Sequence, residues 1–462
     1  MRRSICLLFG VGLAFATVAS ASNVGRRLPS EKTTYTDPVT GVTVTVLTTA
    51  ASNDSKPYQT HPTWTADGQW ILFRADRGGG NGSQAFLVNE KTGDIIQLTD
   101  APGVGTGSLN LARKSNRLFF MRGGPTVRRG ETPPPDAPPP PPRQLIELAL
   151  DPLIADAMAG APQEAAAYER VVATLPADLR DAGGFGLDAD ETAAYWGVAW
   201  GPLPPRPPDA PPREARTAGD RSAIDSRNMD PAERREAARK RFAEAGRGPG
   251  GIRRIDLRTG EVSKVIDVEF RMGHVQANPW VPGEIIYCHE TTGDGPQRMW
   301  TVKADGTGNR ALYAETPDEW VTHETVSAPD EVMFNILCHL PYLGTKPSGV
   351  AVVNLRTDEM RILGQNAGRG FWHCNGSPDG RWAVADDFNG DITLIDRRSG
   401  EQTVLTTGHV MRPDHAHPIF SPDSRHVLIQ SGRLSDGAHL DLMAVTIPDA
   451  LQNRQPALPQ RK

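Results

Sequence analysis

Short apolar segments separated by polar turns recur along most of the chain. Seven times, a short strand-like segment leads into a turn and then into a longer apolar run such as Trp70–Phe73. In the Pro-Asp-Gly form of this turn, proline presets its own φ and glycine supplies a positive φ, so the flanking runs can form a hairpin. The seven turns lie at Trp64–Gly68, Leu111–Ser115, Leu187–Asp190, Asn278–Gly283, Ser327–Asp330, Gly376–Gly380 and Phe420–Asp423.

A second family of turns alternates with the first, as at Lys91–Asp94 and Arg398–Glu401. Two hairpins per repeat make a four-stranded antiparallel sheet, and repeats of about 40–50 residues with this content are typical of propeller blades. The C-terminal repeats have this length, because the spacings between Trp280, Ser327, Ser377 and Ser421 are 47, 50 and 44 residues. The pattern predicts an all-β chain folded as a seven-bladed β-propeller.

Two spacings between repeats are too long, and proline-rich insertions at 123–143 and 202–251 account for them. Pro133–Pro142 holds eight prolines in ten residues, and Pro202–Pro212 holds seven in eleven. Such runs lack backbone donors and favour an extended polyproline conformation, so they cannot join a sheet. Within the second insertion, Asp230–Glu233 resembles a helix start, which predicts either a short surface helix over 234–245 or a disordered loop.

The sequence predicts a signal peptide at the N-terminus and a flexible tail at the C-terminus. Arg2 and Arg3, an apolar run to Val18 and the small residues Ala19–Ala21 are typical of a cleaved signal peptide, which is predicted over 1–21. No later segment is apolar enough to cross a membrane, so a periplasmic or secreted protein is expected. The propeller is predicted over 22–450, with a flexible tail at 451–462. Gly41–Thr49 alternates with period two and is expected to close the ring as an outer strand of the last blade.

Composition narrows the function classes. The formal net charge is −5, which gives no support for nucleic-acid binding. Removal of the signal would leave three cysteines, Cys288, Cys338 and Cys374, so at most one disulfide can form. Each of the three lies in a strand-like segment, where a buried thiol is the simpler interpretation.

Histidines gather in the C-terminal half and give the first indication of chemistry. Eight of the eleven lie between 274 and 417, several of them just before a blade turn. In a propeller these positions surround the central channel on one face. His415 and His417 are two residues apart on one strand face, so both rings can reach one ion, and paired imidazoles suit Zn, Mn, Fe, Ni or Cu. Hydrogen-bonded histidines that fill the channel are the alternative.

The histidine-containing segments resemble oligogalacturonate lyases, the seven-bladed propellers of polysaccharide lyase family 22. The resemblance covers nearly the whole mature chain except the two insertions. The His-Val-Gln and His-x-His-Pro segments are its most specific part, whereas the Pro-Asp-Gly turns are shared by many propellers. The matching segments are Asp37–Gly41, Gly273–Gln276, Tyr287–Glu290, Met299–Val302, Thr322–Glu324 and His415–Pro418.

This resemblance implies a uronate lyase that works by metal-assisted β-elimination on oligogalacturonate-like oligosaccharides, as in pectin degradation. It implies a divalent ion, manganese first, held by His323, His415 and His417. It implies that His274 is the catalytic base, and that an arginine shortly upstream, Arg254 or Arg271, helps to bind the substrate. A neutral histidine can remove the weakly acidic C5 proton of the uronate.

One position departs from the family pattern. Arg412 stands where the family has a metal-binding glutamine, and a guanidinium has no lone pair to give. Either the metal keeps only three protein ligands or Arg412 has taken over part of the role of the glutamine. Arg412 also suggests a second hypothesis, in which its charge recognises a further acidic or sulfated group on an altered substrate. Arg412 is assigned to substrate binding, and His373 and His289 are assigned to it as well. A non-catalytic TolB-like periplasmic scaffold is the alternative function, and it needs no converging histidines.

Overall fold

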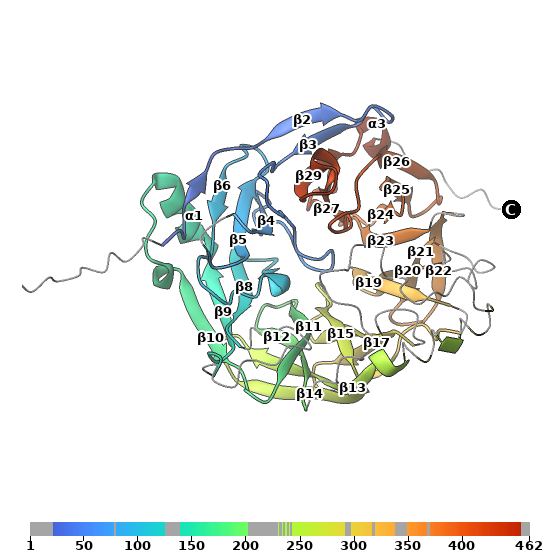
Figure 1. The fold of residues 1–462 in the computed structure, drawn as a ribbon. Helices are drawn as coiled ribbons and strands as arrows, with labels where there is room; N and C mark the ends of the chain where they lie inside the picture. Colours follow the sequence, from blue (N-terminus) through green and yellow to red (C-terminus); the bar gives the residue numbers. More distant parts are fainter. Residues whose placement is uncertain are drawn as a thin grey trace, which may run out of the picture.

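The structure is a computed structural model that describes residues 22–77, 80–124, 139–201, 230, 233, 236–237, 240, 243–291, 297–316, 319–337, 349–366 and 370–453. Seven antiparallel sheets surround a central channel, which confirms the predicted seven-bladed propeller (Figure 1). The predicted signal peptide, residues 133–138 and 202–212 of the proline runs, and Cys338 lie outside the described residues. Within the described part of the chain, no helix combines the length and apolar character that a membrane crossing requires.

The strands of each blade follow one another from the channel outward. Blade one holds β4 (Trp70–Ala75), β5 (Gln84–Asn89), β6 (Ile95–Gln97) and β1 (Arg27–Leu28). Blade two holds β7 (Asn110–Leu111), β8 (Arg117–Arg122), β9 (Gln144–Ala149) and β10 (Glu169–Thr174). Blade three holds β11 (Arg180–Leu187), β12 (Ala193–Ala199), β13 (Arg247–Asp256) and β14 (Val262–Phe270). Blade four holds β15 (Met272–Ala277), β16 (Glu284–His289), β17 (Met299–Lys303) and β18 (Arg310–Ala311).

The remaining blades follow the same order. Blade five holds β19 (Val321–Ala328), β20 (Glu331–Ile336), β21 (Gly349–Asn354) and β22 (Met360–Gln365). Blade six holds β23 (Phe371–Gly376), β24 (Trp382–Asp387), β25 (Ile392–Asp396) and β26 (Gln402–Thr406). Blade seven holds β27 (Ile419–Phe420), β28 (His426–Ser431), β29 (Asp441–Thr446), β3 (Thr43–Val46) and β2 (Thr33–Thr36). Helices α1 (Leu150–Ala159) and α3 (Asp449–Gln452) lie outside the sheets.

The N-terminal segment closes the ring as its alternating pattern predicted. β3 pairs with β29, with Val46 opposite Met443, and β2 adds a fifth strand beyond it. Figure 1 shows this blue segment against the red end of the chain. The predicted tail is corrected at its start, because α3 includes residues 451 and 452 and the carbonyl of Leu451 accepts a hydrogen bond from Arg381 at 2.8 Å.

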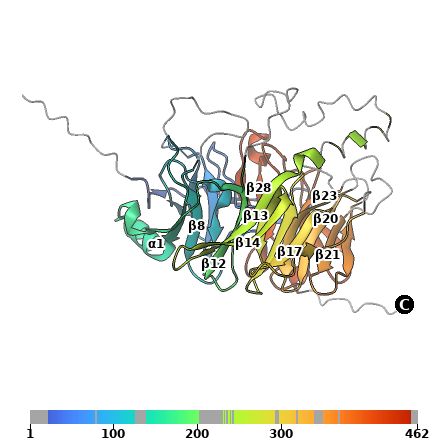
Figure 2. The same cartoon turned by 90° about the horizontal axis from the view of Figure 1, so that it is seen from below.

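Both insertions fall between the second and third strands of a blade, where they leave the sheet intact. The first separates β8 from β9 and the second separates β12 from β13. The predicted end of the second insertion is corrected from 251 to 246, because β13 begins at Arg247. Helical residues occur at 233, 236–237, 240 and 243–245, within or next to the predicted helix range. Figure 2 shows α1 at the rim of the propeller.

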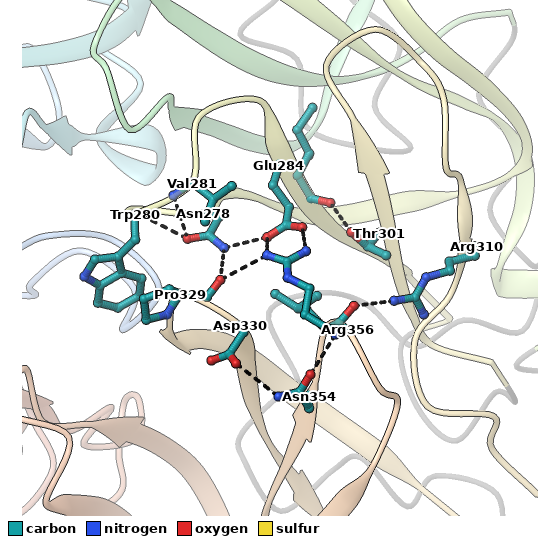
Figure 3. A network of polar contacts seen from close by, with 12 residues as sticks. Asn278, Trp280, Val281, Glu284, Thr301, Arg310, Pro329, Asp330, Asn354 and Arg356 are labelled. Atoms are coloured by element: carbon teal, nitrogen blue, oxygen red, sulfur yellow. Dashed lines mark hydrogen bonds and ion pairs between the residues drawn. The ribbon is translucent and has the colours of Figure 1, made fainter.

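Neighbouring blades are joined by apolar packing and by polar contacts at their edges. Between blades four and five, the guanidinium of Arg356 holds both carboxylate oxygens of Glu284 (Figure 3). Asn278 donates to the carbonyl of Pro329 at 2.8 Å across the same boundary. In the pairing of β15 with β16, Gly273 faces Cys288 and Ala277 faces Ile285. Glu284 therefore lies at the opposite end of blade four from His274.

Candidate functional site

Three histidines lie where the innermost strands of blades four, five and six begin: His274 in β15, His323 in β19 and His373 in β23. At each one the register with the next strand shifts, as in a β-bulge, and bulges re-aim side chains. The shifts fall between Gly273 and Gln276, between Thr322 and Thr325, and between Phe371 and His373.

The backbone at several of these histidines is strained. The φ angles of His274 and His323 are 48° and 56°, and that of His417, just before β27, is 47°. This left-handed region is unfavourable for residues with a Cβ atom, and such strain concentrates at functional sites. The backbone therefore holds His274, His323 and His417 at a conformational cost.

Four histidines from blades five, six and seven form one cluster, with His373 at its centre. The ring centroid of His373 lies 4.3 Å from that of His323, 3.8 Å from that of His417 and 5.6 Å from that of His415. The possible ligand atoms of His373, His415 and Asp386 all lie within 4.8 Å of one another. The three predicted metal ligands are thus brought together, and His373, predicted to bind substrate, joins them.

The cluster fits a divalent transition metal. Nδ1 of His373 lies 3.1 Å from the carboxylate of Asp386, which fixes one ring nitrogen in the way that metal-binding histidines are usually held. The buried Nδ1 of His323 makes no hydrogen bond to any residue that the structure describes. Burial, reinforced by neighbouring histidines, holds the pKa of His323 and of His373 well below the usual value. Both imidazoles are therefore neutral near pH 7, the form that offers a lone pair.

A second polar set lies beside the cluster, around the predicted base His274. Its Nδ1 lies 3.3 Å from Oε1 of Glu324, which is fully buried, and its Nε2 lies 3.7 Å from the carboxylate of Glu290. Nε of Arg298 donates to Oε2 of Glu324 at 2.8 Å. Burial alone would raise the pKa of Glu324, but the charge of Arg298 and the contact with His274 outweigh it and hold that pKa well below the usual range.

The contact between His274 and Glu324 is close without being a well-aligned hydrogen bond. Nδ1 of His274 and Oε1 of Glu324 are both buried, and neither forms such a bond within the described residues. Hydrogen bonds of catalytic groups often align only when substrate is bound. Glu324 is therefore an anion placed next to the imidazole and held there by a buried arginine.

The segment that leads into blade one reaches the same region and joins the two sets. The ring of Tyr58 lies 5.3 Å from that of His274 and 5.1 Å from that of His417. Oε1 of the buried Gln59 lies 2.9 Å from Nδ1 of His417. Burial lowers the pKa of nearby Lys56 to about 7, against the opposing attraction of Asp386 and Asp414.

The other predicted site residues lie at different distances from this region. Arg271 is close, because its carbonyl accepts from the backbone N–H of Glu290 at 2.9 Å. Arg412 is exposed on the loop that leads to His415. His289 is engaged with the carbonyl of Gly246 at 3.0 Å.

Arg254, one of the two arginines predicted to help bind the substrate, is not brought to His274. It pairs across the sheet with Tyr195, and its guanidinium contacts Asp256 at 3.4 Å, near the last residues of β13. The arginine that reaches the His274–Glu324 pair is Arg298, just before β17. Sequence reasoning missed Arg298, although it directly precedes the Met299–Val302 segment of the resemblance.

Fold and site together define a seven-bladed propeller with a four-histidine cluster and a His–Glu–Arg set on one face of its channel. No family model matches the chain. An oligogalacturonate lyase of Dickeya dadantii is 27% identical over 204 residues, which are 38% of this chain and 51% of that protein. An oligogalacturonide lyase of Pectobacterium atrosepticum is 24% identical over 229 residues, 43% of this chain and 56% of that protein. The chain thus spans about half the length of these relatives.

Solved structures extend the likeness to the whole fold. An oligogalacturonate lyase in complex with manganese superposes with a TM-score of 0.67 at 21% identity, over 93% of this chain and 99% of that one. An oligogalacturonate lyase from Vibrio parahaemolyticus gives a TM-score of 0.66 at 19% identity, over 92% and 99% of the two chains. These comparisons confirm the resemblance to oligogalacturonate lyases that the motifs indicated.

Proposed function

We propose that this protein is a metal-dependent lyase that cleaves uronic-acid-containing oligosaccharides of the oligogalacturonate type by β-elimination. One observation carries the proposal: an imidazole backed by a buried carboxylate, His274 with Glu324, lies one tyrosine ring away from a cluster of four histidines. Base and cluster are then both within reach of a single sugar ring. The likeness to oligogalacturonate lyases in sequence and fold supports the same activity.

In the proposed reaction His274 removes the C5 proton of the uronate. Glu324 contacts Nδ1 of this ring, which leaves Nε2 as the atom that takes the proton. The electron pair of the C–H bond forms the C4–C5 double bond, and the bond from C4 to the glycosidic oxygen breaks. That oxygen leaves with the electron pair of the broken bond and takes up a proton from water, and His274 later returns the C5 proton to solvent. Glu324 keeps its negative charge throughout the reaction, because Arg298 stabilises it. This negative charge stabilises the positive charge that develops on His274.

The histidine cluster is proposed to hold a divalent ion, with manganese as the first candidate. His323, His415 and His417, the ligands that the resemblance implies, would hold it, and His373 and Asp386 offer ligand atoms within 4.8 Å of those of His415. When bound, such an ion acts as a Lewis acid toward the uronate carboxylate and makes the C5 proton more acidic. The manganese complex of an oligogalacturonate lyase with this fold supports that choice.

The finer identity of the substrate and the place of action are also proposals. The predicted signal peptide supports a location in the periplasm or outside the cell, where the protein would meet oligosaccharides released from pectin or a related acidic polymer. Arg412 is exposed on the loop that leads to His415, so its charge is available to an additional acidic group on the substrate. A scaffold role is the less favoured alternative, because a scaffold has no use for a buried cationic and anionic set beside clustered histidines.

The deciding experiment follows the ultraviolet absorbance of the unsaturated uronate product. The mature chain is mixed with oligogalacturonides, ulvan, alginate and glycosaminoglycans, with added manganese and with a chelator. A rise in absorbance that the chelator abolishes supports the lyase and identifies its substrate class. A flat trace on every polymer, together with no bound metal in the purified protein, would favour the scaffold.

A further inference from the structure

Tyr58 lies at the meeting point of the two polar sets and belongs to neither. Its ring centroid lies 5.3 Å from His274, 6.0 Å from His373 and 5.1 Å from His417. These three histidines belong to blades four, six and seven, whereas Tyr58 precedes the first strand of blade one. The phenol therefore enters the site from a part of the chain remote from all its neighbours.

The approach of the rings shows how Tyr58 is held. All three histidine rings meet it edge to face, with interplanar angles of 77°, 86° and 64°. Such T-shaped contacts are favourable for aromatic rings and fix their orientation. The residue after it anchors the segment, because the carbonyl of Gln59 accepts a hydrogen bond from Asn375 at 3.2 Å. Tyr58 is half-buried, so part of the residue stays accessible.

The positions of His274 and the histidine cluster determine which other residues a bound substrate contacts. A uronate that presents C5 to His274 and its carboxylate to the histidine cluster must extend between the two. Tyr58 is 5.3 Å, ring to ring, from His274 and 5.1 Å from His417, so a sugar ring in that position contacts it. A tyrosine also suits a sugar chemically, since its ring packs against C–H groups and its hydroxyl, protonated at neutral pH, donates a hydrogen bond.

We propose that Tyr58 is a substrate-contacting residue that holds the uronate ring between His274 and the histidine cluster. This inference rests on the proposed function for the position of the substrate, but it concerns binding and not the chemical step. The ring of Tyr58 packs against the sugar, and its hydroxyl donates a hydrogen bond to a sugar oxygen. Neither contact requires a change in the protonation of Tyr58.

The test compares two variants with digalacturonate as the probe. Tyr58→Phe removes only the hydroxyl and is expected to weaken substrate binding about tenfold, the usual effect of one neutral hydrogen bond. Tyr58→Leu also removes the flat ring and is expected to weaken it further. Binding is measured by calorimetry in a His274→Ala background, which prevents turnover, and KM and kcat are measured in the otherwise wild-type chain. We expect KM to rise more than kcat falls.

Two controls separate a contact from a general disturbance. Tyr168→Phe removes a hydroxyl that bonds Asp156 at 2.9 Å on the rim of blade two, and it should leave binding and turnover unchanged. Manganese affinity and melting temperature should be the same in Tyr58→Phe and the wild type. If the leucine variant does not fold, the phenylalanine variant still decides between contact and no contact.

Each result has one meaning for Tyr58. Wild-type KM and wild-type binding in Tyr58→Phe and in a folded Tyr58→Leu would overturn the contact while leaving the lyase standing. Binding without product in the wild type, weakened by the Tyr58 substitutions, would overturn the lyase and leave the contact standing. A wild-type protein that neither binds digalacturonate nor cleaves it would overturn both.

Discussion

Nδ1 of His274 lies 3.3 Å from Oε1 of Glu324, although the two residues belong to the innermost strands of different blades. The other oxygen of Glu324 is held by Arg298, the residue just before β17 in blade four. A buried charge costs free energy unless it is paired, so the ion pair with Arg298 lowers the cost of burying the Glu324 carboxylate. The negative charge of Glu324 in turn attracts positive charge that develops on the His274 ring. This series of contacts explains how an imidazole, a buried carboxylate and a buried arginine can lie together in the wall of the channel.

The first prediction concerns the base itself. His274→Ala should abolish turnover, because the proposed reaction uses no other base. It should keep the fold, because the His274 side chain is partly exposed. Circular dichroism and manganese content should match those of the wild type. Product formation at the wild-type rate in this variant would remove His274 from the mechanism.

The second prediction concerns Glu324. Glu324→Gln keeps the shape of the side chain but removes the negative charge that orients His274 and stabilises the positive charge developing on it. The kcat should therefore fall by about 100-fold or more with little change in KM. Stability should fall by about 2 kcal/mol, because Arg298 loses a charged partner. Steady-state kinetics and chemical denaturation measure the two effects.

The matched control for Glu324 is Glu284, which also pairs with an arginine (Figure 3). Glu284 lies at the opposite end of blade four from His274. Glu284→Gln should lower stability without lowering kcat. Equal losses of kcat in the two variants would mean that Glu324 acts only through folding.

The third prediction concerns the metal. A chelator should remove manganese and activity together, and added manganese should restore both. Loss of a partner behind a metal-binding histidine usually weakens affinity about 10–100-fold, so removing a ligand in His323→Ala or His415→Ala should weaken it by at least that much. Calorimetric titration with manganese measures the change.

His289→Ala is the control for the metal prediction, because the His289 ring contacts the carbonyl of Gly246 and lies outside the cluster. It should keep the manganese affinity of the wild type. An equal loss of affinity in His289→Ala would show that the effect does not arise from the cluster.

The repeat pattern made the fold predictable, since turn chemistry at fixed spacing fixes the number of blades. It also identified the strand that closes the ring. The pattern did not reveal β1 and β2, because Arg27–Leu28 and Thr33–Thr36 are short and lie at the outer edges of their sheets. Edge pairing of this kind depends on the closed ring and has no local signal.

The site was predictable in its histidines and less so in their partners. His274, His323, His415 and His417 were found because motifs mark them, but His373 was assigned to substrate binding before the bulge at β23 placed it within the cluster. Asp386 and Tyr58 were missed because each contacts histidines of other blades or strands. Such contacts depend on register and bulges, which alternation patterns do not specify.

A different carboxylate, Asp441 at the start of β29, should make stability depend on pH. It is fully buried at the closure between the first and last blades, and neither of its oxygens forms a hydrogen bond within the described residues. Burial, together with the negative charges of Asp54 and Glu31, raises its pKa to about 7 despite the opposing charge of Arg77. Nε2 of His439 lies 3.7 Å from it.

The sign of the effect follows from proton binding. The unfolded chain releases this proton near pH 4, whereas the folded chain keeps it until about pH 7, so stability falls as the pH rises through that interval and stays lowered above it. Asp441→Asn is permanently neutral and should raise the melting temperature by a few degrees at pH 8 and by much less at pH 5. Asp178→Asn, an exposed control, should show no such difference. Calorimetry at the two pH values decides, and an equal shift at both would show that Asp441 is not the titrating group.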